Sequence, residues 1–294
     1  MRVILLILIT FFYISLYGNK KINISKSRPD SLFWKITHSK LNGVSYLFGS
    51  IHIIDKQHFI LPDSALPSLK KSNVLVTEID LNDKAALASS YDQLLLPQGY
   101  GILDYISMIE LQKLDSIWRS MKFTEFEIMS FKMMKPIFWS AAVMNKLIKD
   151  PHEGYDQYFT TKAELFNKRI IGLETPAFAL KQIEALPIQM QYDEVQKTLK
   201  NIKSSKKELN KLFTLYTKRD IQGMMKIINE GLVSMPGLEE KILIERNEFW
   251  FQRLKILFES NNCFIVVGAA HLFGGNGLIK MFEKEGFTLT PFRR

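Results

Sequence analysis

Apolar residues along this chain form short runs near both ends and recur at helical spacing through the middle. Residues 32–39 and 44–52 are rich in β-branched and aromatic side chains, and an Asn-Gly pair lies between them. This pattern predicts a β-hairpin. Residues 62–72 predict a short helix, and the uninterrupted apolar run at residues 74–79 predicts a third strand.

The middle of the chain, residues 84–240, has a mostly helical pattern that is interrupted by one short predicted strand at residues 169–173. Toward the carboxyl end, residues 263–268 predict a buried strand and residues 288–292 a last one. Strands at both ends with helices between them predict one α/β domain over residues 32–294. Its mixed central sheet would be built from the N- and C-terminal segments.

The first 20 residues predict export. A short basic start is followed by an apolar run over residues 3–17, which is shorter than the roughly 20 residues that a spanning helix needs. We therefore expect a signal peptide, or an uncleaved segment that acts as a short anchor, and a periplasmic or secreted protein. Residues 21–31 are polar, contain a proline, and are expected to be a linker.

The amino-acid composition restricts the kinds of site that this protein can contain, and it says less about the fold. The single cysteine, Cys263, excludes an intrachain disulfide and any multi-cysteine metal site. The net charge of +9 is compatible with nucleic acid, with an anionic envelope or membrane surface, or with solubility alone. Five lysines are spread around one predicted helix: Lys200, Lys203, Lys206, Lys207 and Lys211. This is typical of a solvated face, so we expect no nucleic-acid partner, while peripheral envelope association stays open.

One short pattern occurs twice. An apolar strand runs into Gly-x-x-His at Gly49 to His52 and again at Gly268 to His271. Glycine permits close backbone approach at a strand end, and each histidine would then lie at the carboxyl edge of the sheet, where open α/β folds place their sites. The predicted strand at residues 74–79 carries Glu78 at a comparable edge.

If these three strands are neighbours, His52, Glu78 and His271 converge. Two imidazoles and one carboxylate can hold a divalent metal ion (manganese, cobalt or zinc) and leave positions open for water and substrate. Such an ion lowers the pKa of bound water to about 7, which permits hydrolysis near neutral pH. A single histidine or glutamate at a strand end is more often structural, but the duplication favours a site.

Several short motifs occur in order along residues 32–294; they lie at residues 46–52, 61–62, 76–78, 154–156, 172–175, 245–247 and 267–274. In these motifs the chain resembles the TraB/GumN family, which is related to the TIKI metalloproteases and more distantly to erythromycin esterases and ChaN-like proteins. The resemblance implies a metal-dependent hydrolase that uses His52, Glu78 and His271. Its members are often exported.

The resemblance also points to residues outside the predicted ligand set. Arg246, on a helix predicted over residues 238–261, would bind a substrate carboxylate or a developing oxyanion; alternatively it is an exposed arginine that pairs with neighbouring glutamates. Glu174 would act as a base or orient a ligating histidine, or it would cap the helix that begins at Pro176. Asp156 is expected to have an orienting or structural role.

The leading hypothesis is therefore an exported metal-dependent hydrolase, with a peptidase preferred and a peptide or small molecule as substrate. Glu78 is either a metal ligand or the general base. Two alternatives stay open: a haem- or iron-binding protein with an axial donor such as Tyr155, and a non-catalytic envelope protein. The sequence indicates neither the substrate nor the oligomeric state.

Overall fold

The computed structural model describes residues 31–39, 41, 43–184, 186–233 and 237–292. A six-stranded mixed sheet lies at its centre, with the strand order β6-β4-β7-β2-β1-β8. Its strands are β1 (Phe33–Thr37), β2 (Ser45–Ser50), β4 (Val74–Ile79), β6 (Arg169–Glu174), β7 (Cys263–Gly268) and β8 (Thr288–Pro291). The predicted α/β class, with a sheet built from both ends of the chain, is confirmed.

The sheet has a parallel part and an antiparallel part. β6, β4, β7 and β2 run parallel to one another, whereas β1 pairs antiparallel with both β2 and β8. The predicted hairpin is present, and its register places Phe33 opposite Phe48. C-terminal strand β7 lies between N-terminal strands β2 and β4, so segments about 190 to 220 residues apart in sequence pair directly in the sheet.

Both faces of the parallel part are covered. In β7, Phe264 and Val266 belong to one hydrophobic core while Ile265 and Val267 belong to the other. Helix α7 (Tyr155–Leu165) packs on β4, β6 and β7, and α12 (Glu245–Phe258) packs on β6 and on α13 (Leu278–Lys284). Burial on two sides explains why these strands are continuous apolar runs rather than alternating ones.

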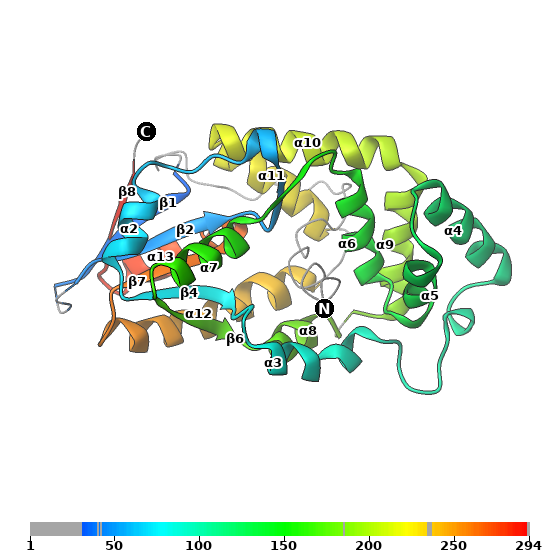
Figure 1. The fold of residues 1–294 in the computed structure, drawn as a ribbon, viewed down its shortest axis with the longest axis horizontal. Helices are drawn as coiled ribbons and strands as arrows, with labels where there is room; N and C mark the ends of the chain where they lie inside the picture. The colour runs from blue at the N-terminus through cyan, green and yellow to red at the C-terminus, as the bar shows by residue number, and fades with distance from the viewer. Residues whose placement is uncertain (1–30, 40, 42, 185, 234–236, 293–294) are drawn as a thin grey trace.

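Helix α2 (Ala65–Lys71) lies at the β8 end of the molecule (Figure 1). The other helices make up most of the region predicted to be helical and extend toward the end opposite β8 (Figure 1). They are α3 (Lys84–Ser89), α4 (Met108–Ser120), α5 (Glu125–Met133), α6 (Ile137–Leu147), α8 (Pro176–Glu184), α9 (Ile188–Lys200), α10 (Ile202–Lys218) and α11 (Ile221–Val233). A second sheet joins β3 (Ile53–Asp55) to β5 (Pro151–Glu153). The sequence did not predict this pair, because strands of three residues are too short to establish a period.

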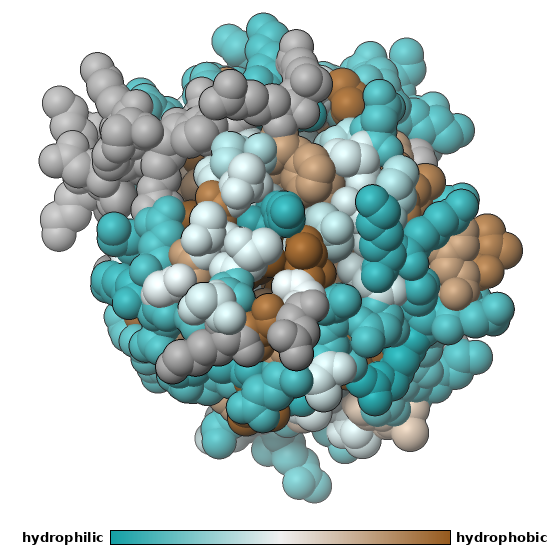
Figure 2. All heavy atoms as spheres, turned by 90° about the vertical axis from the view of Figure 1, so that its left-hand side faces the viewer, coloured by the Kyte–Doolittle hydropathy of each residue, from teal (hydrophilic) through white to brown (hydrophobic). Residues whose placement is uncertain are grey.

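The arrowheads of β2 and β4 point from the β8 end of the molecule toward the helical region (Figure 1). The opposite end, seen in Figure 2, presents mostly hydrophilic residues with small hydrophobic patches between them. The predicted export segment and all but the last residue of the predicted linker lie outside the described residues. In the part of the chain that is described, no helix has both the length and the apolar character needed to cross a bilayer.

Candidate active site

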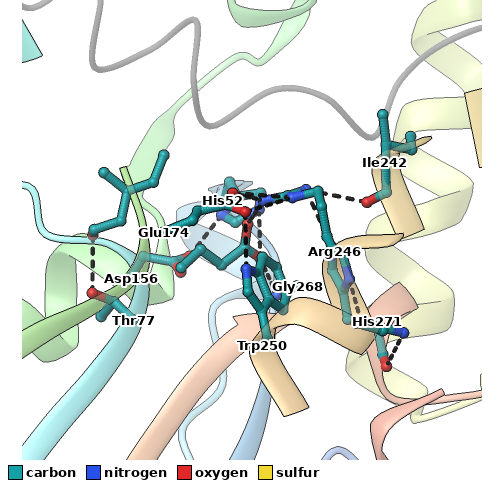
Figure 3. A network of polar contacts seen from close by, with 12 residues as sticks. His52, Thr77, Asp156, Glu174, Ile242, Arg246, Trp250, Gly268 and His271 are labelled. Carbon is teal, nitrogen blue, oxygen red and sulfur yellow. Dashed lines mark hydrogen bonds and ion pairs between the residues drawn. The ribbon is translucent and has the colours of Figure 1, made fainter. Parts of the chain in front are cut away.

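The three residues of the predicted site lie at the carboxyl ends of three adjacent parallel strands. His52 follows β2, Glu78 is the penultimate residue of β4, and His271 ends a single 3₁₀ turn, η5 (Ala269–His271), after β7. His52 Nε2 is 3.6 Å from Glu78 Oε1, and all three side chains are buried. His271 joins this pair through Arg246, which contacts both Glu78 and His271 Nε2. Figure 3 shows the network from close by, with His52, Arg246 and His271 labelled.

Glu78 is held by the backbone of the neighbouring strand. Its Oε1 accepts a hydrogen bond from the Gly268 N–H at 2.6 Å, and its Oε2 accepts one from Arg246 Nη2 at 2.7 Å. Burial by itself would raise the pKa of this carboxyl, but the guanidinium of Arg246 and the two histidines outweigh burial, so the pKa lies below its usual value. Glu78 is therefore ionised at neutral pH.

Arg246 is the centre of the network. Its Nε lies 3.0 and 3.2 Å from the two carboxylate oxygens of Glu174, and its Nη2 is 2.5 Å from Oε1. The guanidinium also lies over the ring of Trp250 at 4.5 Å, and Trp250 Nε1 donates to Glu174 Oε2 at 2.9 Å. The structure places Arg246 in contact with Glu78 and His271, and because the side chain is buried, the alternative of an exposed arginine on the helix surface is wrong.

Glu174 does not cap the helix that follows it. The Oγ1 of Thr175 accepts the Phe178 N–H at 3.2 Å and takes that role at the start of α8. Glu174 instead faces Arg246 from the end of β6, the edge strand beside β4. Burial raises its pKa against the opposing effect of the guanidinium. For Arg246, the two carboxylates outweigh burial and raise the pKa, so the side chain stays charged.

His52 has a carboxylate partner that the sequence placed only in a general orienting role. Asp156, in the first turn of α7, lies 2.8 Å from His52 Nδ1 through its Oδ2. The helix can approach this closely because Gly154 packs on the His52 carbonyl group, where a Cβ would collide with it. Burial alone would lower the pKa of His52, but Asp156 and Glu78 raise it to about 9.

His271 has a neutral partner. Its Nδ1 lies 2.7 Å from Asn247 Oδ1, while Asn247 Nδ2 donates to the carbonyl oxygens of His271 and Asn276 at 3.1 and 2.8 Å. Because the amide N–H groups go to two carbonyls, the amide oxygen faces the ring, so Nδ1 carries the proton. Burial lowers the pKa of His271 to about 3, and Arg246 acts in the same direction.

Asn247 is the functional residue that sequence reasoning missed. It lies within the motif at residues 245–247, which was interpreted only through its arginine. Its place directly after Arg246 in that motif was the available signal, but its partner His271 is 24 residues away in sequence. Only the packing of α12 against η5 identifies it.

Two further observations bear on the expected ligands. Tyr155, the candidate haem donor, is buried, and its hydroxyl donates to the Ile60 carbonyl and accepts the Ile60 N–H. Among the described residues, no three His, Cys, Asp or Glu side chains stand close enough to hold a metal ion as they are placed. Arg246 contacts two members of the predicted ligand set, Glu78 at 2.7 Å and His271 Nε2 at 3.4 Å.

The arrangement thus gathers a protonated imidazole, a neutral imidazole, the carboxyl groups of Asp156, Glu78 and Glu174, and a guanidinium in a buried cluster. Comparison with known proteins places this cluster in context. The model of the TraB/PrgY/gumN family matches residues 32–291, which confirms the resemblance inferred from the short motifs. A comparison with curated proteins and one with solved structures each gave no match.

Proposed function

The chain belongs to the TraB/PrgY/gumN family, and we propose that it is an exported metal-dependent hydrolase with a peptide as its preferred substrate. In this proposal His52, His271 and Glu78 hold the metal, and Arg246 and Glu174 assist. The family match supports membership of the family and nothing finer. The proposed activity is therefore argued from the cluster of buried side chains described above.

One observation carries the proposal: each histidine is oriented through Nδ1 by an oxygen acceptor. His52 is held by the carboxylate of Asp156 and His271 by the amide oxygen of Asn247. Histidines that ligate metals almost always donate their other ring N–H to such an oxygen, which sets the tautomer and the ring orientation. With Nδ1 occupied, Nε2 is the ligating atom of both rings, on the side of Glu78 and Arg246.

The donor chemistry fits a first-row divalent ion. Two imidazole nitrogens and one carboxylate suit manganese, cobalt or zinc, and three ligands leave positions for water and substrate. When bound, such an ion would bring the pKa of a bound water to about 7. The cluster as it stands is closed by Arg246, so loading requires this side chain to leave Glu78 and His271.

The protein groups would have distinct roles. Arg246 presents a planar fork of donors, which suits a substrate carboxylate or an oxyanion that develops during attack on a carbonyl. Glu174 keeps that fork in the site through its two oxygens. Glu78 is ionised and lies beside His52 Nε2, so it can serve as ligand or as the acceptor of a proton from water.

Metal content is the test. The purified chain should retain manganese, cobalt or zinc after gel filtration, and His52→Ala and His271→Ala should retain neither metal nor peptide hydrolysis. His38→Ala is the matched control, because His38 lies at the far end of the sheet beside Phe287. A folded wild-type chain that binds no divalent metal contradicts the proposal. Unchanged cellular function in both site variants would favour the non-catalytic alternative.

A further inference from the structure

We infer that Arg246 is a resident cation that competes with the metal ion for Glu78 and His271, and that Glu174 is the partner that retains it when the metal binds. The inference rests on the proposed function, since it assumes that a metal binds at this cluster. It adds a way in which metal binding is regulated, because the side chain of Arg246 determines how tightly the metal is held.

The competition follows from shared lone pairs. Arg246 Nη2 is 2.7 Å from Glu78 Oε2, and Nη1 is 3.4 Å from His271 Nε2. These are two of the three donors in the proposed ligand set. Nδ1 of His271 is committed to Asn247, so Nε2 is the nitrogen through which the ring can bind either the guanidinium or a metal. The guanidinium and the metal therefore exclude each other at this side of the cluster.

Arg246 has a second anchor that does not involve the ligand set. Glu174 receives Nε and Nη2, its side chain has no exposed area, and Trp250 Nε1 fixes its other oxygen. The Ile242 carbonyl accepts Nη1 at 3.2 Å, and the Trp250 ring lies under the guanidinium. When Glu78 is withdrawn, Arg246 still has a buried counter-charge, so its release does not leave an isolated cation in the core.

Charge balance explains why the cluster needs such a cation. Glu78 and Glu174 are buried carboxylates that share Arg246, whose two ion pairs span 2.7 and 2.5 Å. In the absence of metal, the guanidinium pairs with both of them, and His52 also lies beside Glu78 at 3.6 Å. Linkage then requires reciprocity: any change that weakens the contact between Arg246 and Glu78 tightens metal binding, and any change that strengthens it weakens metal binding.

Two substitutions with opposite expected signs test this, by calorimetric titration of the full-length chain with Mn²⁺ and with Zn²⁺. Arg246→Gln removes the competitor and should tighten metal binding by about tenfold or more. Glu174→Gln leaves Glu78 as the only carboxylate partner of Arg246 and should weaken metal binding about fivefold or more. Arg253→Gln is the matched control, because it removes a positive charge from the same helix beside Phe249, outside the cluster.

Arg246→Gln also leaves the buried carboxylate of Glu174 without its cation and leaves Glu78 with His52 alone, so its thermal melting is measured alongside. If this variant does not fold, the double variant Arg246→Gln with Glu174→Gln removes the uncompensated carboxylate and is titrated in its place. If wild type and the folded Arg246 variants bind metal with equal affinity, the inferred competition is wrong but the proposed metal site still stands. If wild type and every folded variant bind no metal, the competition and the proposed metal site are both wrong. If Arg253→Gln changes the metal affinity as much as Arg246→Gln does, the effect comes from the loss of any positive charge, and the inferred competition is wrong.

Discussion

His52 and His271 occupy equivalent places in two copies of one motif, at the ends of adjacent parallel strands, and both are buried. Their protonation nevertheless differs. Asp156 and Glu78 raise the pKa of His52 to about 9, whereas burial lowers that of His271 to about 3. At neutral pH, the first ring is a cation and the second is neutral in the metal-free protein.

The difference comes from the atom that faces each Nδ1. Burial favours the neutral ring in both cases, and only a nearby negative charge reverses this preference. Helix α7 supplies a carboxylate through Asp156, and α12 supplies an uncharged amide through Asn247. The side chains of Asp156 and Asn247 differ by one polar atom, yet only the first is charged. The motif therefore determines where each histidine lies, and the partner residue from another helix determines whether the histidine is charged.

The strongest test of this comparison replaces each of the two histidines by glutamine. His52→Gln removes the cation between Asp156 and Glu78 and should destabilise the metal-free protein by about 3 to 5 kcal/mol, as expected when one partner of a buried ion pair is lost. His271→Gln exchanges one neutral group for another and should cost about 1 to 2 kcal/mol. Urea unfolding in the presence of a chelator measures both, and equal losses would mean that His52 is not charged.

The pH dependence of stability gives a second test. The folded pKa of His52, about 9, lies above its usual 6.5, so its contribution is fully present below about pH 6.5 and is lost as the pH rises toward 9. The loss should amount to at most about 3 kcal/mol. The folded pKa of His271, about 3, lies below 6.5, so its contribution is present above pH 6.5 and is lost as the pH falls.

Urea midpoints of the metal-free protein from about pH 5 to about pH 10, which brackets both the usual histidine pKa and the raised pKa of His52, would record the alkaline loss. Asp156→Asn keeps the hydrogen-bonding oxygen but removes the charge, so it should flatten this part of the profile. A profile that keeps its alkaline slope in Asp156→Asn would assign the slope to a group other than His52.

The smallest expected effect comes from exchanging the two partners. In the double variant Asp156→Asn with Asn247→Asp, the pKa of His52 should fall and that of His271 should rise, each by about one unit or more. Imidazole resonances followed by NMR through a pH titration report both values. If the pKa values of His52 and His271 keep their order and their difference, the two partners do not cause that difference, and unequal burial of the two rings does.

Much of the site could be predicted before the structure. His52, Glu78 and His271 were selected because each ends an apolar run, and parallel strands bring their carboxyl ends to one edge. The strand order β4-β7-β2 confirms that assumption. The small sheet of β3 and β5, the cap by Thr175 and the role of Asn247 were not predicted. The pairing of β3 with β5 and the role of Asn247 depend on contacts between separate segments, and the Thr175 cap depends on one local contact with Phe178. Contacts of this kind leave no period in the sequence.

The sequence by itself determined the α/β class, the strands that make up the sheet, the family and the three residues at the strand ends, because burial on two faces and repeated motifs leave a local pattern. The tertiary structure alone decided the electrostatics. It brought Asp156 to one histidine and Asn247 to the other, and it placed Arg246 between Glu78 and Glu174. The physical reason is that pKa shifts and ion pairs depend on distances of a few ångströms between elements that lie far apart along the chain.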